Sequence, residues 1–205
     1  MLKNNVTQGL LQAIERSPAG IAGLDVLESL GLADAATLRT TLSRLGRGGR
    51  IVHLKRGTYS TIPIRDAYAC AQALFNGYLG FSTALYLHKL IAEVPFTITV
   101  VTTAASETKK VGEYEFRAVA LGEKAVGFER RGDYVVSTRA KTLFDCVYLP
   151  EYAVERRKLV EAFREARLAA REWKEFRLYV AKFASQTGRT KMLAVEKEIR
   201  GGKYG

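Results

Sequence analysis

Four polar side chains within one predicted helix have the chemistry to read DNA bases: Arg39, Thr40, Ser43 and Arg44. An arginine guanidinium can donate two hydrogen bonds to a guanine, and serine or threonine hydroxyl groups can contact any base. Leu38, Leu42 and Leu45 recur at helical spacing, which predicts that this face packs inward. The four polar side chains are therefore expected on the remaining faces of the helix, where they can meet a polar partner.

A second group of side chains is suited to contacts with DNA phosphates: Thr37, Arg47, Arg50, Lys55, Arg56 and Tyr59. Such contacts fix the orientation of a protein on the duplex without reading its sequence. Lys55 and Arg56 are expected at the tip of a hairpin whose strands cover residues 51–54 and 58–60. Gly57 supplies the positive φ that a tight hairpin turn needs. This pattern is typical of a recognition helix followed by a basic wing.

Three short helices must position these side chains, over residues 4–16, over residues 23–30 and from about residue 35 onward. A break at residues 17–20 separates the first two, and Gly31 is suited to end the second. Asp34 can cap the third helix through the free N–H groups of its first turn. Because the connections are tight and the third helix is basic, we predict a winged-helix DNA-binding domain over residues 1–65.

The remainder, residues 66–205, is predicted to contain an α+β core over 66–150 followed by helices over 151–205. Within the core we expect helices over 66–76 and 82–91 and strands over 96–103, 114–121 and 133–137. In the second of these helices, Ala84, Leu87, Ile91 and Val94 keep the spacing of a buried face. The predicted fold class is therefore α+β, with an N-terminal winged helix-turn-helix, an α+β middle module and a C-terminal helical segment.

The charge is unevenly distributed along the 205 residues, whose 32 basic and 21 acidic side chains give a net charge of +11. The net charge is +5 over residues 1–65, zero over 66–150 and +6 over 151–205. A surplus of this size favours an anionic partner, first of all nucleic acid, although a solubilising surface is an alternative. Six side chains define a second basic face on the C-terminal helices: Arg156, Arg157, Arg164, Arg167, Arg171 and Lys174. Composition leaves open whether that face meets DNA or an acidic protein.

Several kinds of chemistry find no support in the residues. The glycines at positions 46, 48 and 49 lack the Gly-Lys-Ser/Thr ending of a phosphate-binding loop. His53 and His88 are the only histidines, Cys70 and Cys146 lack metal-ligand spacing, and Asp145 is a lone carboxylate in an apolar helix. We therefore expect no enzyme, no catalytic residue, no metal and no cofactor. With no apolar segment long enough to span a bilayer and with widely spaced cysteines, we expect a cytoplasmic protein without a membrane partner.

Three blocks of the chain, in this order, resemble the AbiEi-type antitoxins. They are Leu54-Lys55-Arg56-Gly57-Thr58-Tyr59, then residues 82–90 (STALYLHKL), and then residues 137–146 (STRAKTLFDC). The resemblance covers roughly residues 5–150 and implies that residues 66–205 form the C-terminal domain of that family. It also implies an autorepressor that binds inverted repeats of double-stranded DNA in its own promoter. The same protein would be the antitoxin of a type IV toxin–antitoxin, or abortive-infection, pair whose toxin resembles a nucleotidyltransferase.

Other hypotheses stay open at this point. The chain could be a solitary winged-helix transcriptional regulator, or a protein-interaction module that has no toxin partner. An enzyme acting on nucleic acid would need Glu113, Glu115 or Asp133 as metal ligands, and the sequence lacks the Glu-x-Lys triplet of restriction nucleases.

Overall fold

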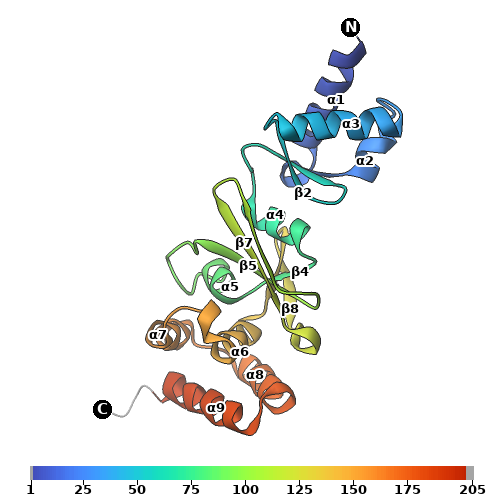
Figure 1. Ribbon diagram of the computed structural model, residues 1–205. Coiled ribbons are helices and arrows are strands. Elements are labelled where there is room, and N and C mark those ends of the chain that lie inside the picture. Colours follow the sequence, from blue (N-terminus) through green and yellow to red (C-terminus); the bar gives the residue numbers. More distant parts are fainter. Residues whose placement is uncertain (1, 202–205) are drawn as a thin grey trace. The chain divides into compact units, whose positions relative to one another are not determined.

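Helices and strands alternate along the first part of the chain, and helices alone follow at its C-terminal end. The structure, a computed structural model, describes residues 2–201 (Figure 1). The elements are α1 (Leu2–Arg16), β1 (Ile21–Gly23), α2 (Leu24–Ser29), α3 (Ala35–Arg47), β2 (Ile51–Lys55), β3 (Thr58–Thr61), α4 (Ala67–Leu74), β4 (Gly77–Leu79), α5 (Phe81–Leu87), β5 (Thr97–Thr102), β6 (Glu107–Val111), β7 (Tyr114–Ala120), β8 (Phe128–Arg131), β9 (Tyr134–Ser137), α6 (Arg139–Tyr148), α7 (Arg156–Ala166), α8 (Ala170–Phe183) and α9 (Gln186–Arg200). The chain is thus mixed α+β, as predicted, and it divides into two units: residues 1–76 with 109–115, and residues 77–108 with 116–205.

The first unit combines α1, α2 and α3 with a small antiparallel sheet of strand order β1-β3-β2. Ile21 pairs with Ser60 on one side of the central strand β3, and Ile51 pairs with Thr61 on the other. The helices cover this sheet with a core of fully buried aliphatic side chains, which includes Leu10, Ile14, Leu27, Leu38, Leu42 and Ile51. The three predicted helices and the predicted hairpin are present within two residues of their expected bounds.

Local signals explain where α3 begins and ends. Gly31 adopts a positive φ of 62° after α2, and the Asp34 carboxylate then accepts a hydrogen bond of 2.9 Å from the Thr37 N–H. This satisfies one of the donors left free in the first helical turn, as the sequence predicted. At the other end Gly49 has a φ of 65°, which turns the chain out of the helix and into β2.

The hairpin of β2 and β3 closes through a turn of only two residues, Arg56 and Gly57. Gly57 has a φ of 72°, the conformation predicted for it. Its carbonyl oxygen accepts a 2.7 Å hydrogen bond from the N–H of Leu24, the first residue of α2. The tip of the hairpin is therefore anchored to the helix that precedes α3.

The first unit extends past the expected boundary at residue 65 and includes α4. Asp66 caps α4 by accepting a 2.9 Å hydrogen bond from the Ala69 N–H. The helix packs against β2 and β3, where the Cys70 thiol lies 3.5 Å from the Ser60 hydroxyl in a buried contact. Because Cys70 and Ala71 are fully buried, α4 completes the hydrophobic interior beside the hairpin.

The second unit contains most of a sheet of strand order β6-β7-β5-β4-β9-β8, of which residues 109–115 are grouped with the first unit. The expected strands over 96–103, 114–121 and 133–137 correspond to β5, β7 and β9. Three strands of this sheet were not expected from the sequence: β4, which is three residues long, and the two edge strands β6 and β8. Strand β1 of the first unit was not expected either. The edge strands read ETKKV and FERR, and these charged, largely exposed segments carry none of the alternation that marks a half-buried strand.

One predicted helix is too long. Helix α5 ends at Leu87, whereas the spacing predicted continuation to residue 91. Lys89 has a φ of 60°, which is incompatible with a right-handed helix. Ile91 is nevertheless buried, but Val94 is 67% exposed, so the predicted apolar face stops before it.

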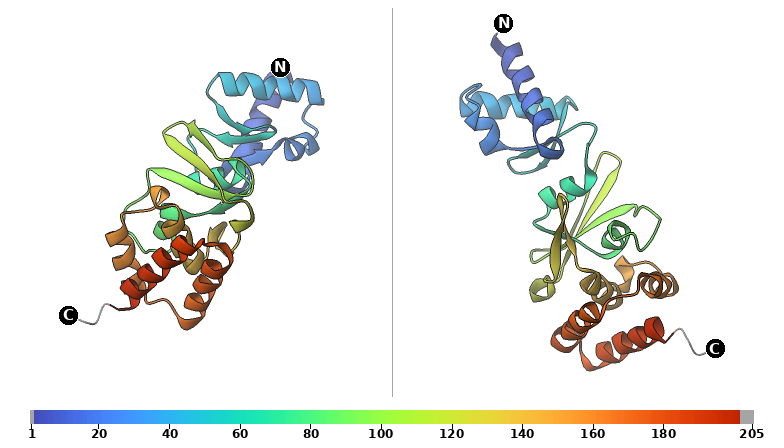
Figure 2. Two further views of the ribbon diagram at one scale, coloured as in Figure 1. Left: turned by 60° about the horizontal axis from the view of Figure 1, so that its bottom comes forward. Right: turned by 180° about the vertical axis from the view of Figure 1, so that it is seen from behind.

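Helices α6 to α9 lie together in the second unit (Figure 2), and they supply most of the buried side chains of its core. Helix α6 packs against α5, α8 and α9, while α7 packs against α9. Trp173, Phe176 and Val180 on α8 are buried, and so are Met192, Val195 and Ile199 on α9. Both stripes have helical spacing and serve as core.

Candidate nucleic-acid interface

The residues of α3 separate into an inner face, an outer face and two flanks. Leu38, Leu42 and Leu45 are buried, whereas all four candidate base-reading side chains are exposed. Each residue turns an α-helix by about 100°, which places Thr40 and Ser43 opposite the leucines together with Arg47. Arg39 and Arg44 lie on opposite flanks of the helix.

Arg39 lies on the flank that faces α2. Its guanidinium is 3.3 Å from the carboxylate of Glu28, and the two side chains are 63% and 37% exposed. A solvent-exposed ion pair of this kind contributes about 0–1 kcal/mol to stability. A ligand that binds the guanidinium more strongly can therefore displace Glu28. Arg39 is therefore held beside α2 in this structure but is not locked there.

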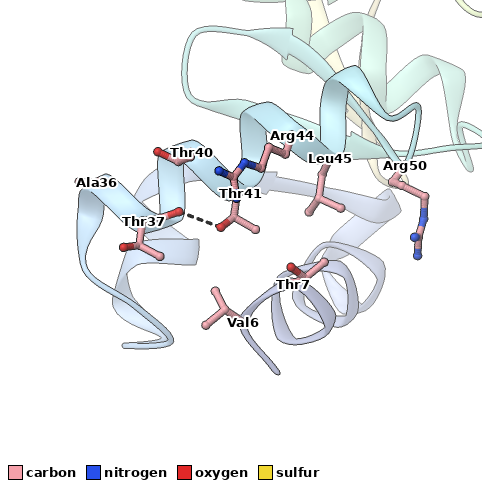
Figure 3. A pocket seen from close by; sticks show the side chains of 9 residues that line it. All are labelled: Val6, Thr7, Ala36, Thr37, Thr40, Thr41, Arg44, Leu45 and Arg50. Atoms are coloured by element: carbon pink, nitrogen blue, oxygen red, sulfur yellow. Dashed lines mark hydrogen bonds between the residues drawn. The ribbon is translucent and has the colours of Figure 1, made fainter. Parts of the chain in front are cut away.

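Arg44 lies on the flank that faces α1, where α1 and α3 border a groove of about 520 Å³. Figure 3 shows side chains of α3 above Val6 and Thr7 of α1, with Arg50 at one end. Thr37, Thr40 and Thr41 line the groove beside Arg44. Hydroxyl groups and two guanidiniums thus share one concave surface.

Thr37 has a structural role at this groove. Its hydroxyl donates a 2.7 Å hydrogen bond to Asp34 Oδ2, while its N–H donates to Asp34 Oδ1. These two bonds lower the pKa of the Asp34 carboxyl. Thr41 likewise donates to the Thr37 carbonyl oxygen at 2.8 Å (Figure 3). The hydroxyl groups of Thr37 and Thr41 therefore stabilise α3 itself, and that of Thr40 is left facing outward.

The segment from the start of α3 to residue 65, just past the hairpin, is basic without any acidic side chain. Residues 35–65 contain seven lysines and arginines and no aspartate or glutamate. Arg47, Arg50 and Arg56 are exposed. Since no carboxylate within the segment can neutralise them, the segment presents uncompensated positive charge to the solvent.

The remaining hairpin candidates are more constrained. Lys55 donates a 3.1 Å hydrogen bond to the side-chain oxygen of Asn76 and is partly buried. The Tyr59 ring packs against the core of the first unit and lies 5.2 Å from the His53 ring, measured between ring centroids. Arg56 is thus the hairpin candidate whose side chain is most accessible.

The candidate basic face of the C-terminal helices differs, because carboxylates lie among its cations. Arg156 pairs with Glu198 at 2.8 Å, Arg157 pairs with Glu161 at 3.0 Å, and Arg164 donates to the Glu198 carbonyl oxygen at 3.0 Å. The three other candidates, Arg167, Arg171 and Lys174, are exposed. Half of the predicted face is therefore engaged in contacts within the second unit.

The most buried charges of the second unit form one ion pair, whose complete burial was not predicted from the sequence. Lys141 donates a short hydrogen bond to Asp145, and both side chains are completely buried. Burial lowers the pKa of Lys141 and raises the pKa of Asp145 to about 6. Arg139, another cation of α6, instead forms two 2.8 Å hydrogen bonds with Glu172. The i, i+4 spacing of Lys141 and Asp145 was visible in the sequence, but it is equally typical of exposed pairs.

His88 is a buried packing residue. Its Nε2 lies 2.7 Å from the Ser137 carbonyl oxygen, and its Nδ1 lies 2.6 Å from an Arg131 nitrogen. Because a carbonyl oxygen can only accept and a guanidinium can only donate, Nε2 carries the proton and Nδ1 is the acceptor. Burial lowers the pKa of His88, and the nearby Arg131 charge acts in the same direction.

Among residues 2–201, no group of three or more histidine, cysteine or acidic side chains is arranged to hold a metal ion. Within the same range, every helix is too short or too polar to cross a membrane. No family model matches the chain, and comparison with curated proteins gives no match.

Proposed function

We propose that this chain binds double-stranded DNA sequence-specifically through α3 and the β2–β3 hairpin. The observation that carries the proposal is the exposed, basic and acid-free segment of residues 35–65. A surface of this kind attracts phosphates over a long range and releases their counterions on contact.

The arrangement of the first unit supports a winged-helix mode of binding. Its order is helix, strand, helix, helix and then a two-stranded hairpin, and β1 pairs with the second strand of that hairpin. In helix-turn-helix proteins the recognition helix enters the major groove and the preceding helix crosses the backbone. In this chain α3 would be the recognition helix, and the hairpin turn at Arg56 would lie beside the duplex.

The proposed roles follow from the faces of α3. Thr40 and Ser43 on the outer face, with Arg44 on the flank, would contact base edges, and an arginine–guanine pair contributes about 1–3 kcal/mol of discrimination. Arg47, Arg50 and Arg56 would contact phosphates. Arg39 would also contact base edges, once its guanidinium has left Glu28 and turned to the DNA.

We also propose that the DNA recognised is the promoter of the chain's own operon and that the protein is the antitoxin of a type IV pair. This part of the proposal is supported by the three sequence blocks that resemble AbiEi-type antitoxins. It predicts inverted repeats in the operator and a toxin gene that encodes a nucleotidyltransferase-like protein.

An electrophoretic mobility shift with the upstream DNA of the gene tests the DNA-binding proposal. We expect tight shifts at about 150 mM salt, little binding to unrelated DNA of equal length, and loss of selectivity in the Arg39→Ala/Arg44→Ala variant. Equal and salt-sensitive binding to both DNAs would contradict sequence-specific recognition.

The antitoxin role needs a separate test, namely co-expression with the neighbouring gene of the operon. Rescue of growth by this chain would support it. A neighbouring product that is harmless alone, or whose toxicity this chain leaves unchanged, would contradict it and favour a solitary regulator.

A further inference from the structure

An apolar groove lies in the second unit, far in sequence from the proposed DNA-binding surface. Its volume is about 510 Å³, and α6, α7 and α9 supply most of its lining. Leu159, Met192 and Val195 form a buried floor, and the partly buried Val147 and Tyr148 form a wall. Apolar concave surfaces of this size are typical of binding sites for apolar side chains.

The charged residues that line this groove are both basic. Arg156 is paired with Glu198, but no ion pair of Lys191 occurs within residues 2–201. The N-terminus of α9 borders the groove through Thr187 and Gly188, and the amides of a first helical turn favour negative charge. The rim is therefore electropositive around an apolar floor.

The groove has no acidic lining residue and no reactive group. Cys146 lines it, but burial raises the pKa of the Cys146 thiol, so the thiol is neutral and behaves as a small apolar side chain. Lys124 lies outside the lining and adds a further positive charge, 5.7 Å from the centre of the Tyr148 ring. Acidic side chains do occur nearby along the chain, at Glu151 and Glu155, but neither lines the groove.

We infer that this groove docks a short segment of a partner protein that combines apolar side chains with flanking carboxylates. The apolar side chains would occupy the floor at Met192, while the carboxylates would lie beside Lys191 and the first turn of α9. Charge complementarity selects this occupant, because the charged lining residues are both basic and the first turn of α9 also favours negative charge. The inference does not depend on DNA binding by the first unit, and it names a surface and a partner chemistry that the proposed antitoxin role leaves open.

Fluorescence anisotropy with the full chain tests this inference. The probe is a fluorescein-labelled helical peptide with leucine at i, i+3, i+4 and i+7 and glutamate at its other positions. Two matched peptides replace either the glutamates with lysine or the leucines with serine. We expect binding of the first peptide only, weakened by added salt.

Three variants localise the binding. Lys191→Glu reverses the charge at the rim and is expected to lower the affinity for the acidic peptide about tenfold. Thr187→Trp places a large side chain at the exposed mouth of the groove and is expected to abolish peptide binding. Lys197→Glu makes the same charge change on α9 outside the groove lining and should leave the affinity within about twofold. All three variants should keep the DNA affinity of the wild type, which separates this test from that of the proposed function.

Four results would overturn the inference: no binding of the acidic peptide, equal binding of the lysine peptide, equal weakening by Lys191→Glu and Lys197→Glu, or displacement of the peptide by duplex DNA. The last result would assign the groove and its rim to nucleic acid.

Discussion

Two basic regions of this protein have almost the same net charge and present it in different ways. Residues 35–65 carry seven basic and no acidic side chains, whereas residues 151–205 carry fourteen basic and eight acidic ones. In the first region all the cations except the partly buried Lys55 are exposed, and Glu28 of α2 pairs with Arg39. In the second region ion pairs join Arg156 to Glu198, Arg157 to Glu161 and Arg177 to Glu196.

Net charge is thus a poor guide to function when the positions of the counter-charges are unknown. Positive charge that already has a carboxylate beside it holds helices together, and its field largely cancels at a distance. Positive charge without such a partner remains available to phosphates. We therefore expect substitutions of cations in the second unit to change stability, and substitutions in α3 to change DNA affinity.

The largest expected effect is that of Lys141→Met, which removes the cation from a completely buried ion pair. Breaking such a pair costs about 3–5 kcal/mol of unfolding free energy, because the remaining charge is left uncompensated. Urea denaturation at pH 7 measures this loss. The double variant Lys141→Met/Asp145→Leu is the control, and it should recover most of the stability because neither charge then remains.

The same substitution predicts a pH dependence. Burial already raises the pKa of Asp145 to about 6, and Lys141 holds it below the value that burial alone would give. Without Lys141, the folded-state pKa rises further above the unfolded value of about 3.9. A raised folded-state pKa contributes stability at low pH that is lost as pH rises through it. The Lys141→Met variant should therefore lose less stability at pH 5 than at pH 7; an equal loss at both would contradict this account of Asp145.

Arg139→Ala is expected to have the next largest effect. The guanidinium forms two 2.8 Å hydrogen bonds with Glu172, whose side chain is mostly buried. Losing charge-assisted bonds of this kind costs about 1.5–3 kcal/mol of stability. Arg139→Lys should recover only part of it, since an ammonium cannot form the same bidentate contact. Unchanged stability together with weaker DNA binding would place Arg139 in a DNA interface instead.

Arg44→Ala is expected to weaken DNA binding while leaving the stability of the fold almost unchanged. Its side chain is exposed, so we expect unfolding free energy to change by no more than about 0.5 kcal/mol. Binding to the specific operator should weaken by about 1–3 kcal/mol, with little change for unrelated DNA. Titration of both DNAs measures the difference. Uniform weakening of both would reassign Arg44 to a phosphate contact.

The smallest expected effects are those of the phosphate candidates Arg47, Arg50 and Arg56. Each alanine substitution should reduce the slope of log K against log salt by about 0.9 and weaken all DNA sequences alike. Lys55→Ala is the comparison variant. Because the Lys55 ammonium already donates a hydrogen bond to Asn76, its removal should change the salt slope less than removal of Arg56. A larger change for Lys55 than for Arg56 would show that this hydrogen bond opens on binding.

The elements around α3 could be predicted from sequence because their signals are local. The Asp34 cap, the leucine stripe and the turn at Gly57 each act within a few residues, and each is present in the structure. The partners of individual cations could not be predicted in this way. Glu28 beside Arg39, Asn76 beside Lys55 and Glu172 beside Arg139 lie 11, 21 and 33 residues away in the chain.

Burial and strand pairing were equally hard to predict from the sequence at some positions. Lys141 has the sequence context of a solvated lysine, yet it is completely buried among aromatic side chains of α6, α8 and β4. The edge strands β6 and β8 have the composition of loops, because an edge exposes charged side chains on both faces. Both features depend on which segments meet in space, and that information is spread over the whole chain.

The comparison of the two basic regions is tested most directly by two matched double variants of the full chain. Arg44→Ala/Arg47→Ala and Arg156→Ala/Arg157→Ala each remove two arginines, from α3 and from α7. Anisotropy titrations of upstream and unrelated DNA over a salt series measure affinity, selectivity and salt slope for both. We predict that the α3 variant loses operator affinity and selectivity, while the α7 variant matches the wild type in both. Equal losses in the two variants would contradict the assignment of DNA recognition to α3.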